Sequence, residues 1–130
     1  MILLVEDNPG DVLLLETQLE AAGNDIPLRV ASTTGYALGV LRARPADLGL
    51  VIVDIRLAGC DGWEVLEALA GDPALARIPA AVLTSSSRAD DRTHARALGI
   101  ETESYFIKPV GLEGYRDLVS RLVALHGVPS

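Results

Sequence analysis

The chain has 130 residues and carries 18 acidic against 11 basic side chains, which gives a net charge of −7. This length fits a single domain that buries about two-thirds of its unfolded surface. An acidic chain without runs of Lys or Arg is poorly suited to bind nucleic acid, and its apolar stretches are too short to span a membrane. Because its single cysteine, Cys60, cannot pair within the chain, and because no signal peptide opens the sequence, we expect a cytoplasmic protein.

Five apolar runs alternate with five helical segments along the chain. They lie at about 2–5, 28–31, 49–53, 80–83 and 104–107, and all but the second, which contains Arg29, carry a continuous apolar run of the kind typical of buried parallel strands. Capping and breaking residues place the helices at about 9–23, 33–44, 61–71, 88–98 and 112–127. Right-handed crossovers put helices on both faces of such a sheet. The sequence therefore predicts a doubly wound, three-layer α/β/α fold, as one domain over residues 1–130 with no effector domain.

Three carboxylates directly follow two of the predicted strands. Glu6 and Asp7 follow the first strand, and Asp54 follows the third. In an open parallel sheet the carboxyl ends of the strands meet at one edge, where ligands bind. Two charges ~5 Å apart repel by roughly 3 kcal/mol at an effective dielectric of 20, and a hard divalent cation such as Mg²⁺ relieves that repulsion. The alternative is that Glu6 and Asp7 only favour the positive N-terminus of the first helix.

A hydroxyl and a cation follow two further strands. Thr84 ends the fourth strand, and Lys108 ends the fifth, directly before Pro109. Taken alone, Thr84 is explained as part of a loop that caps the next helix, and Lys108 is explained as a solvated lysine at the end of a strand. Together with the acids they form a set suited to phosphoryl transfer, in which a metal and Lys108 neutralise the phosphoryl group, Thr84 donates to it, and Asp54 is the oxygen nucleophile.

Four segments carry these residues in order: LLVEDNPGD (3–11), VIVDIRLAGCDGWEVL (51–66), AVLTSSS (81–87) and YFIKP (105–109). With them the chain, from Ile2 to about Leu125, resembles the CheY-like receiver domain of two-component response regulators. The resemblance implies a flavodoxin-like sheet with the strand order 2-1-3-4-5. It also implies a phospho-accepting switch, not an enzyme, whose reactions are its own phosphorylation and dephosphorylation.

The resemblance assigns roles to the acidic residues. Asp54 accepts a phosphoryl group from a sensor histidine kinase. Asp7, Asp54 and the backbone carbonyl of Arg56 bind Mg²⁺, and Glu6 helps through water. The side chain of Arg56 faces the phosphorylation pocket in the family, where it would shield the acyl phosphate from water or pair with Glu6. The alternative for Arg56 is an ordinary solvated loop arginine.

The resemblance also assigns roles at the ends of the fourth and fifth strands. Thr84 and Lys108 hold the phosphate, and the bond between Lys108 and Pro109 is cis. Tyr105 occupies the position of an aromatic switch that turns inward as Thr84 moves toward the phosphate. Its alternative is an ordinary half-exposed strand aromatic. One departure from the family is Ala58, which stands where the loop after Asp54 usually carries a proline.

A narrower resemblance concerns the partner kinase. The segments VEDNPGD (5–11) and RIPAAVLTSSS (77–87) resemble stand-alone response regulators that work with bacterial phytochrome kinases. Asp11 in the first of them is equally explained as a first-turn acid favoured by the helix dipole. We expect a homodimer formed through the surface of the fourth helix, fifth strand and fifth helix, since related stand-alone receivers often pair there.

Three other functions remain open at this point. The chain could be an adaptor that works without phosphorylation, or a flavin-binding electron carrier on the same fold. It could also be a small aspartyl phosphatase, but such enzymes need a second acid two residues after the nucleophile, where this chain has Arg56. His94 and His126 lack the spacing of metal ligands, and the sequence predicts no role for them.

Overall fold

The computed structural model describes residues 1–23, 25–57 and 61–126. It contains a parallel sheet with the strand order β2-β1-β3-β4-β5. The strands are β1 (Ile2–Val5), β2 (Leu28–Ala31), β3 (Leu50–Val53), β4 (Ala80–Thr84) and β5 (Tyr105–Ile107). The helices are α1 (Pro9–Ala21), α2 (Thr34–Arg42), α3 (Trp63–Gly71), α4 (Ala89–Ala97) and α5 (Leu112–Leu125), and a short 3₁₀ helix, Thr102–Ser104, precedes β5. The predicted doubly wound fold and strand order are confirmed.

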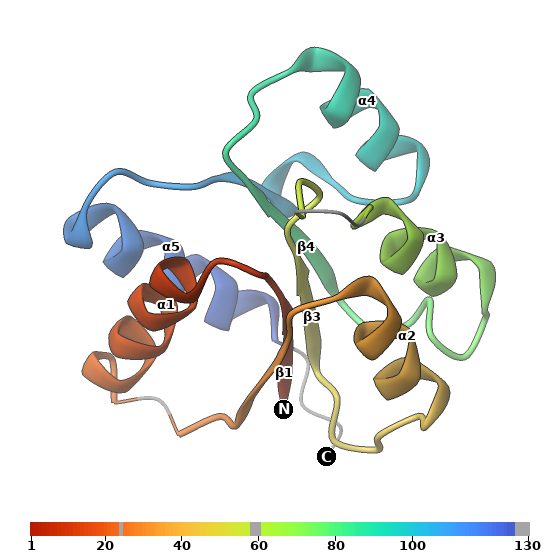
Figure 1. Cartoon of the computed structure of the whole chain (residues 1–130), viewed down its shortest axis with the longest axis horizontal. Helices are drawn as coiled ribbons and strands as arrows, with labels where there is room; N and C mark the ends of the chain where they lie inside the picture. The colour runs from red at the N-terminus through yellow and green to blue at the C-terminus, as the bar shows by residue number, and fades with distance from the viewer. Residues whose placement is uncertain (24, 58–60, 127–130) are drawn as a thin grey trace.

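Helices cover both faces of the sheet and enclose two apolar cores. Figure 1 shows α1 and α5 on one side of the strands, α2 and α3 on the other, and α4 at the top of the view. Along β1, Leu3 and Val5 face the core under α2, α3 and α4, whereas Ile2 and Leu4 face the core under α1 and α5. This burial on both faces is the reason that β1 and β3 are continuously apolar, whereas β2 at the edge of the sheet contains Arg29. Within the described chain, no helix is both long and apolar enough to cross a membrane.

The parallel register brings the ends of neighbouring strands level with one another. Val5 of β1 is paired with Val53 of β3, and Thr84 of β4 is paired with Ile107 of β5. The residues that follow these strand ends therefore leave the sheet at the same edge. This edge is where an open parallel sheet binds its ligands.

The start of α3 is packed tightly against the loop that follows β3. The helix begins at Trp63, slightly later than predicted, and the Asp61 side chain accepts a 2.9 Å hydrogen bond from the Trp63 amide. A Cβ atom at Gly62 would lie 2.8 Å from the Cα of Ile55, and closer still to the carbonyl oxygen of Asp54. Only glycine allows this close approach, so Gly62 fixes α3 next to the residue that carries the candidate chemistry.

Candidate functional site

Three carboxylates meet at the edge formed by the ends of β1 and β3. Glu6, Asp7 and Asp54 each offer an oxygen, and these oxygens all lie within 4.8 Å of one another. Glu6 is 2% exposed and Asp54 is 4% exposed. They meet because β1 and β3 are neighbours in parallel register, so that the residues directly after each strand emerge side by side.

Lys108 brings a positive charge into this cluster from the end of β5. Its ammonium nitrogen lies 2.8 Å from Glu6 Oε2, 2.8 Å from Asp54 Oδ2 and 2.7 Å from Asp11 Oδ2. Burial alone would lower the pKa of Lys108, but its close contacts with the carboxylates of Asp11, Asp54 and Glu6 outweigh burial and raise it. The cation is therefore fixed at the centre of the acids and stays charged.

Glu6 is the acid whose ionisation is most strongly disfavoured. Burial, with the Asp54 charge, raises the pKa of Glu6 from 4.5 to about 7, against the opposing effect of the nearby Lys108 ammonium and of the hydrogen bond from the Asn8 amide. Glu6 Oε2 is buried and, despite the ion pair with Lys108, has no hydrogen bond of acceptable geometry to any described residue. An all-oxygen cluster with an excess of negative charge and an unsatisfied buried oxygen fits a hard divalent cation.

Thr84 is the last residue of β4, as the sequence predicted, and Tyr105 is the first residue of β5. Thr84 is fully buried, its hydroxyl accepts a 3.1 Å hydrogen bond from the Ser86 amide, and its carbonyl accepts a 2.7 Å bond from the Lys108 amide. Tyr105 is 7% exposed, so the alternative of a half-exposed aromatic is wrong. Its hydroxyl has no hydrogen-bond partner in the described chain, burial raises its pKa, and the Arg92 guanidinium carbon lies 4.7 Å from its ring centroid.

The side chain of Arg56 points away from the acids toward α4. Its backbone amide donates a 2.9 Å hydrogen bond to Asp54 Oδ1, but its guanidinium forms a 2.6 Å ion pair with Asp91 of α4. Ser86 donates a 2.8 Å bond to the same oxygen of Asp91. Neither a pairing of Arg56 with Glu6 nor a freely solvated side chain is found, and sequence reasoning missed this network.

Asp11 and Pro109 also differ from expectation. Asp11 contacts Lys108, so it is more than an acid that favours the helix dipole; its place in the first turn after the Glu6-Asp7 pair was the signal. The cis bond predicted between Lys108 and Pro109 is wrong, since no peptide bond in the described residues is cis. The trans form is the one that X-Pro bonds ordinarily prefer. Ala58 and Cys60 lie outside the residues that the structure describes, so the expectations for them are not tested.

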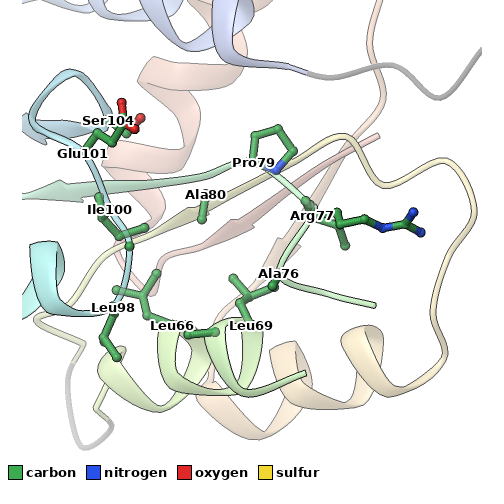
Figure 2. Close-up of a pocket in the computed structure, with 13 residues that line it drawn as sticks. Leu66, Leu69, Ala76, Arg77, Pro79, Ala80, Leu98, Ile100, Glu101 and Ser104 are labelled. Carbon is green, nitrogen blue, oxygen red and sulfur yellow. The ribbon is translucent and has the colours of Figure 1, made fainter. Parts of the chain in front are cut away.

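Two pockets lie at different distances from the acid cluster. A pocket of about 400 Å³ lies between α3 and the segment after α4, near the start of β4 and away from the acids. Figure 2 shows Leu66, Leu69, Leu98 and Ile100 turned toward this space and the guanidinium of Arg77 turned away from it. The second pocket is a groove of about 460 Å³ along α1 and β2, and it includes the cluster's own acids. Its lining residues are Glu6, Asp7, Pro9, Val12, Leu13, Glu16, Val30 and Ser32.

This chain is similar to known proteins over nearly its whole length. The family described as "Response regulator receiver domain" matches residues 2–120. The probable methanogenesis regulatory protein FilR2 from Methanothrix harundinacea is 32% identical over 126 residues, which cover 94% of this chain and 80% of FilR2. Several other curated relatives are longer, and the chain spans between 12% and 50% of their length.

Solved structures of response regulators are also similar. The phosphorylated cyanobacterial phytochrome response regulator RcpA is 29% identical, with a TM-score of 0.85 and coverage of 99% of this chain and 97% of RcpA. The Mn²⁺-bound response regulator Rcp1 is 28% identical, with a TM-score of 0.83 and coverage of 99% and 98%; Rcp1 is a protein of Synechocystis.

Proposed function

Because this chain belongs to the response regulator receiver domain family, whose members are generally phospho-accepting switches, we propose that it accepts a phosphoryl group from a sensor histidine kinase on Asp54. The observation that carries this proposal is the position of Asp54. Its carboxylate lies among the acids of a candidate cation site and 2.8 Å from the Lys108 ammonium. A nucleophilic oxygen, a cation site and a fixed ammonium are the parts that phosphoryl transfer to a carboxylate requires.

In the proposed reaction, an oxygen of Asp54 forms a bond to phosphorus as the bond between phosphorus and the histidine nitrogen of the kinase breaks. The imidazole leaves with the bonding electron pair. Lys108 and the hydroxyl of Thr84 then hold the oxygens of the transferred group. Asp7, Asp54 and the backbone carbonyl of Arg56, with Glu6 through water, would hold Mg²⁺, which supplies charge neutralisation for the phosphoryl oxygens.

A neighbouring surface supports docking of the kinase. The groove along α1 and β2 is lined by Glu6 and Asp7 and by apolar side chains, of which Leu13 is 63% exposed. A partner helix seated there would reach the acid cluster without crossing the rest of the molecule. We propose a cytoplasmic bacteriophytochrome kinase as the donor, because the phytochrome response regulator RcpA and the bacteriophytochrome response regulator AtBRR share the fold over nearly their whole length.

The proposed output is a change in protein contacts. Movement of Thr84 toward the phosphoryl group and of the buried Tyr105 would change the surface formed by α4, β5 and α5. The exposed apolar side chains Ile107, Val110 and Leu112 lie on or just after β5, and they support a homodimer that uses this surface. Light scattering after size exclusion should show a dimer, and monomer alone, with and without a phosphoryl mimic, would contradict it.

Phosphotransfer from a panel of histidine kinases tests the central proposal. We expect Mg²⁺-dependent uptake of labelled phosphate by the wild type and none by Asp54→Asn. Asp47→Asn, which changes an exposed acid away from the cluster, is the matched control and should behave as wild type. Uptake that persists in Asp54→Asn would place the acceptor elsewhere. A strong preference for a kinase that is not a phytochrome would remove the phytochrome assignment alone.

A further inference from the structure

Helix α4 is attached to the protein in a different way from the other helices. Its buried residues are Asp91 and Ala95. A surface helix usually docks through a stripe of three to four apolar residues per two turns. Since α4 buries a carboxylate and one methyl group, polar and aromatic contacts must hold it in place.

The buried carboxylate of Asp91 is the centre of these contacts. Its Oδ2 atom accepts hydrogen bonds from the Arg56 guanidinium at 2.6 Å and from the Ser86 hydroxyl at 2.8 Å. Burial alone would raise the pKa of Asp91, but the Ser86 and Arg56 hydrogen bonds and the charge of Arg56 outweigh it and lower the pKa. A charge-assisted pair of this kind is stronger than a neutral hydrogen bond, and its loss would leave a buried charge without its cation.

Arg56 therefore connects two parts of the protein. Its amide is bound to Asp54 Oδ1, inside the candidate site, while its guanidinium is bound to the first turn of α4. Ser86 makes a second connection of the same kind, because its amide donates a hydrogen bond to the Thr84 hydroxyl and its own hydroxyl donates one to Asp91. Both residues that touch Asp91 are thus tied through their backbone to a residue of the site.

We propose that Arg56, Ser86 and Asp91 form a latch that holds α4 in place, and that a change at Asp54 reaches α4 through Arg56. The route from Asp54 rests on the proposed function, whereas the latch itself does not. Arg56 acts here as a positioning residue: it sets where α4 lies and takes no part in bond making. When an occupant of the Asp54 site displaces the Arg56 amide, the guanidinium moves with it and α4 is released.

Hydrogen–deuterium exchange of peptides that cover α4 tests the latch. In Arg56→Gln and in Asp91→Asn, we expect the α4 amides to exchange roughly tenfold faster, because local opening becomes easier. Arg56→Lys keeps the charge and should restore part of the protection. Unchanged exchange in β1 and β3 will show that the variants are folded. Wild-type exchange of α4 in both Arg56→Gln and Asp91→Asn would overturn the latch.

A second ion pair provides the matched control. Arg44 forms a 2.7 Å pair with Asp72 beyond the ends of α2 and α3, and both side chains are partly exposed. Arg44→Gln removes the same charge and the same kind of contact, and it should leave exchange in α4 unchanged. Faster exchange of α4 in Arg44→Gln would show that any loss of an arginine loosens this helix, which would also overturn the proposal.

The fluorescence of the tryptophan tests whether a change at Asp54 reaches α4 through Arg56. Trp63 is the single tryptophan, and its ring stacks on His94 of α4 at a centroid distance of 3.8 Å. We expect Mg²⁺ and beryllium trifluoride, a phosphoryl mimic, to change Trp63 emission in the wild type and in Arg44→Gln. In Arg56→Gln the change should be at least threefold smaller, although fluorine NMR shows the mimic bound.

The outcomes separate the two proposals. Full emission change in Arg56→Gln, with the mimic bound, would overturn the route through Arg56. If fluorine NMR shows that the mimic does not bind even to the wild type, the proposed function and the route from Asp54 both fail. The exchange experiment would still decide whether the latch holds α4.

Discussion

The helix pair α1 and α5 and the helix α4 are attached to the same sheet by different kinds of contact. The pair packs through side chains such as Leu15, Leu19, Leu118 and Leu122, each at most 6% exposed. Burial of one such leucine contributes about 1.5–3 kcal/mol, and it requires no particular charge nearby. On α4 the corresponding place is taken by Asp91, whose partner Arg56 keeps 43% of its side chain exposed.

This difference shows which side of the protein can respond to the site. Apolar packing scales with the area buried and is indifferent to a new charge at Asp54. An ion pair that is partly open to water stabilises by about 1 kcal/mol, and a neighbouring charge can redistribute it. Segments that move are drawn from the parts of a structure with low local stability. The acid cluster lies between the two regions, and α4 is the region poised to move.

The largest expected effect is on the apolar side. Leu118 of α5 is 3% exposed, so Leu118→Ala should lower the free energy of unfolding by about 2–5 kcal/mol through lost burial and a cavity. Urea denaturation followed by circular dichroism measures the change. Leu13→Ala on α1 makes the same chemical change at a side chain that is 63% exposed, and its effect should stay below about 0.5 kcal/mol. Equal losses in the two variants would contradict the packing argument.

The next effect concerns Glu6, where the two regions meet. Without a divalent cation, wild-type stability should fall as pH rises from about 4.5, the ordinary pKa of Glu6, through about 7, its pKa in the folded protein. The unfolded chain loses this proton first, so ionisation favours unfolding over that window, by up to about 3 kcal/mol. The lowered pKa of Asp91 makes stability depend on pH only below about 3.8, the ordinary pKa of an aspartate, and therefore outside this window.

Glu6→Gln should remove this slope in urea denaturation series. Mg²⁺ should stabilise the wild type more at about pH 8 than at about pH 5, because the cation favours the ionised carboxylate. A slope of the same size in Glu6→Gln would show that another group is responsible.

The residues of the site show which contacts could be predicted from the sequence and which could not. The meeting of Asp54 with Glu6 was predictable, because parallel strands end at one edge whatever the details of packing. The Arg56–Asp91 pair was not, since its residues are 35 positions apart, with α3 and β4 between them, and no local pattern specifies that they meet. The trans bond before Pro109 shows the limit of resemblance, because an X-Pro bond is decided by a small energy difference.

The two regions also differ in how their helices begin. Asn8 caps α1, and its side chain accepts hydrogen bonds from the amides of Gly10 at 2.9 Å and Asp11 at 3.1 Å. Asn8→Ala should lower the free energy of unfolding by about 1 kcal/mol, because two amides lose their partner. Asn8→Ser keeps a capping oxygen and should recover most of the loss. A cost below about 0.3 kcal/mol in Asn8→Ala would show that water replaces the cap.

The smallest expected effect is a gain on α4, where the capping position is held by Arg88. This residue makes no side-chain capping hydrogen bond to the described part of the chain, although its backbone is already extended, with φ −66° and ψ 134°. Arg88→Ser supplies the missing oxygen at a compatible geometry, so stability should rise by about 0.5–1 kcal/mol. Because a better-formed α4 is harder to open locally, its amides should exchange more slowly, while those of α1 should not change. Arg88→Ala separates this gain from mere loss of the arginine, since it removes the charge without adding a cap. If Arg88→Ala slowed exchange as much as Arg88→Ser, the charge of Arg88 and not the missing cap would limit the stability of α4. The difference in capping between α1 and α4 would then not explain their difference in stability.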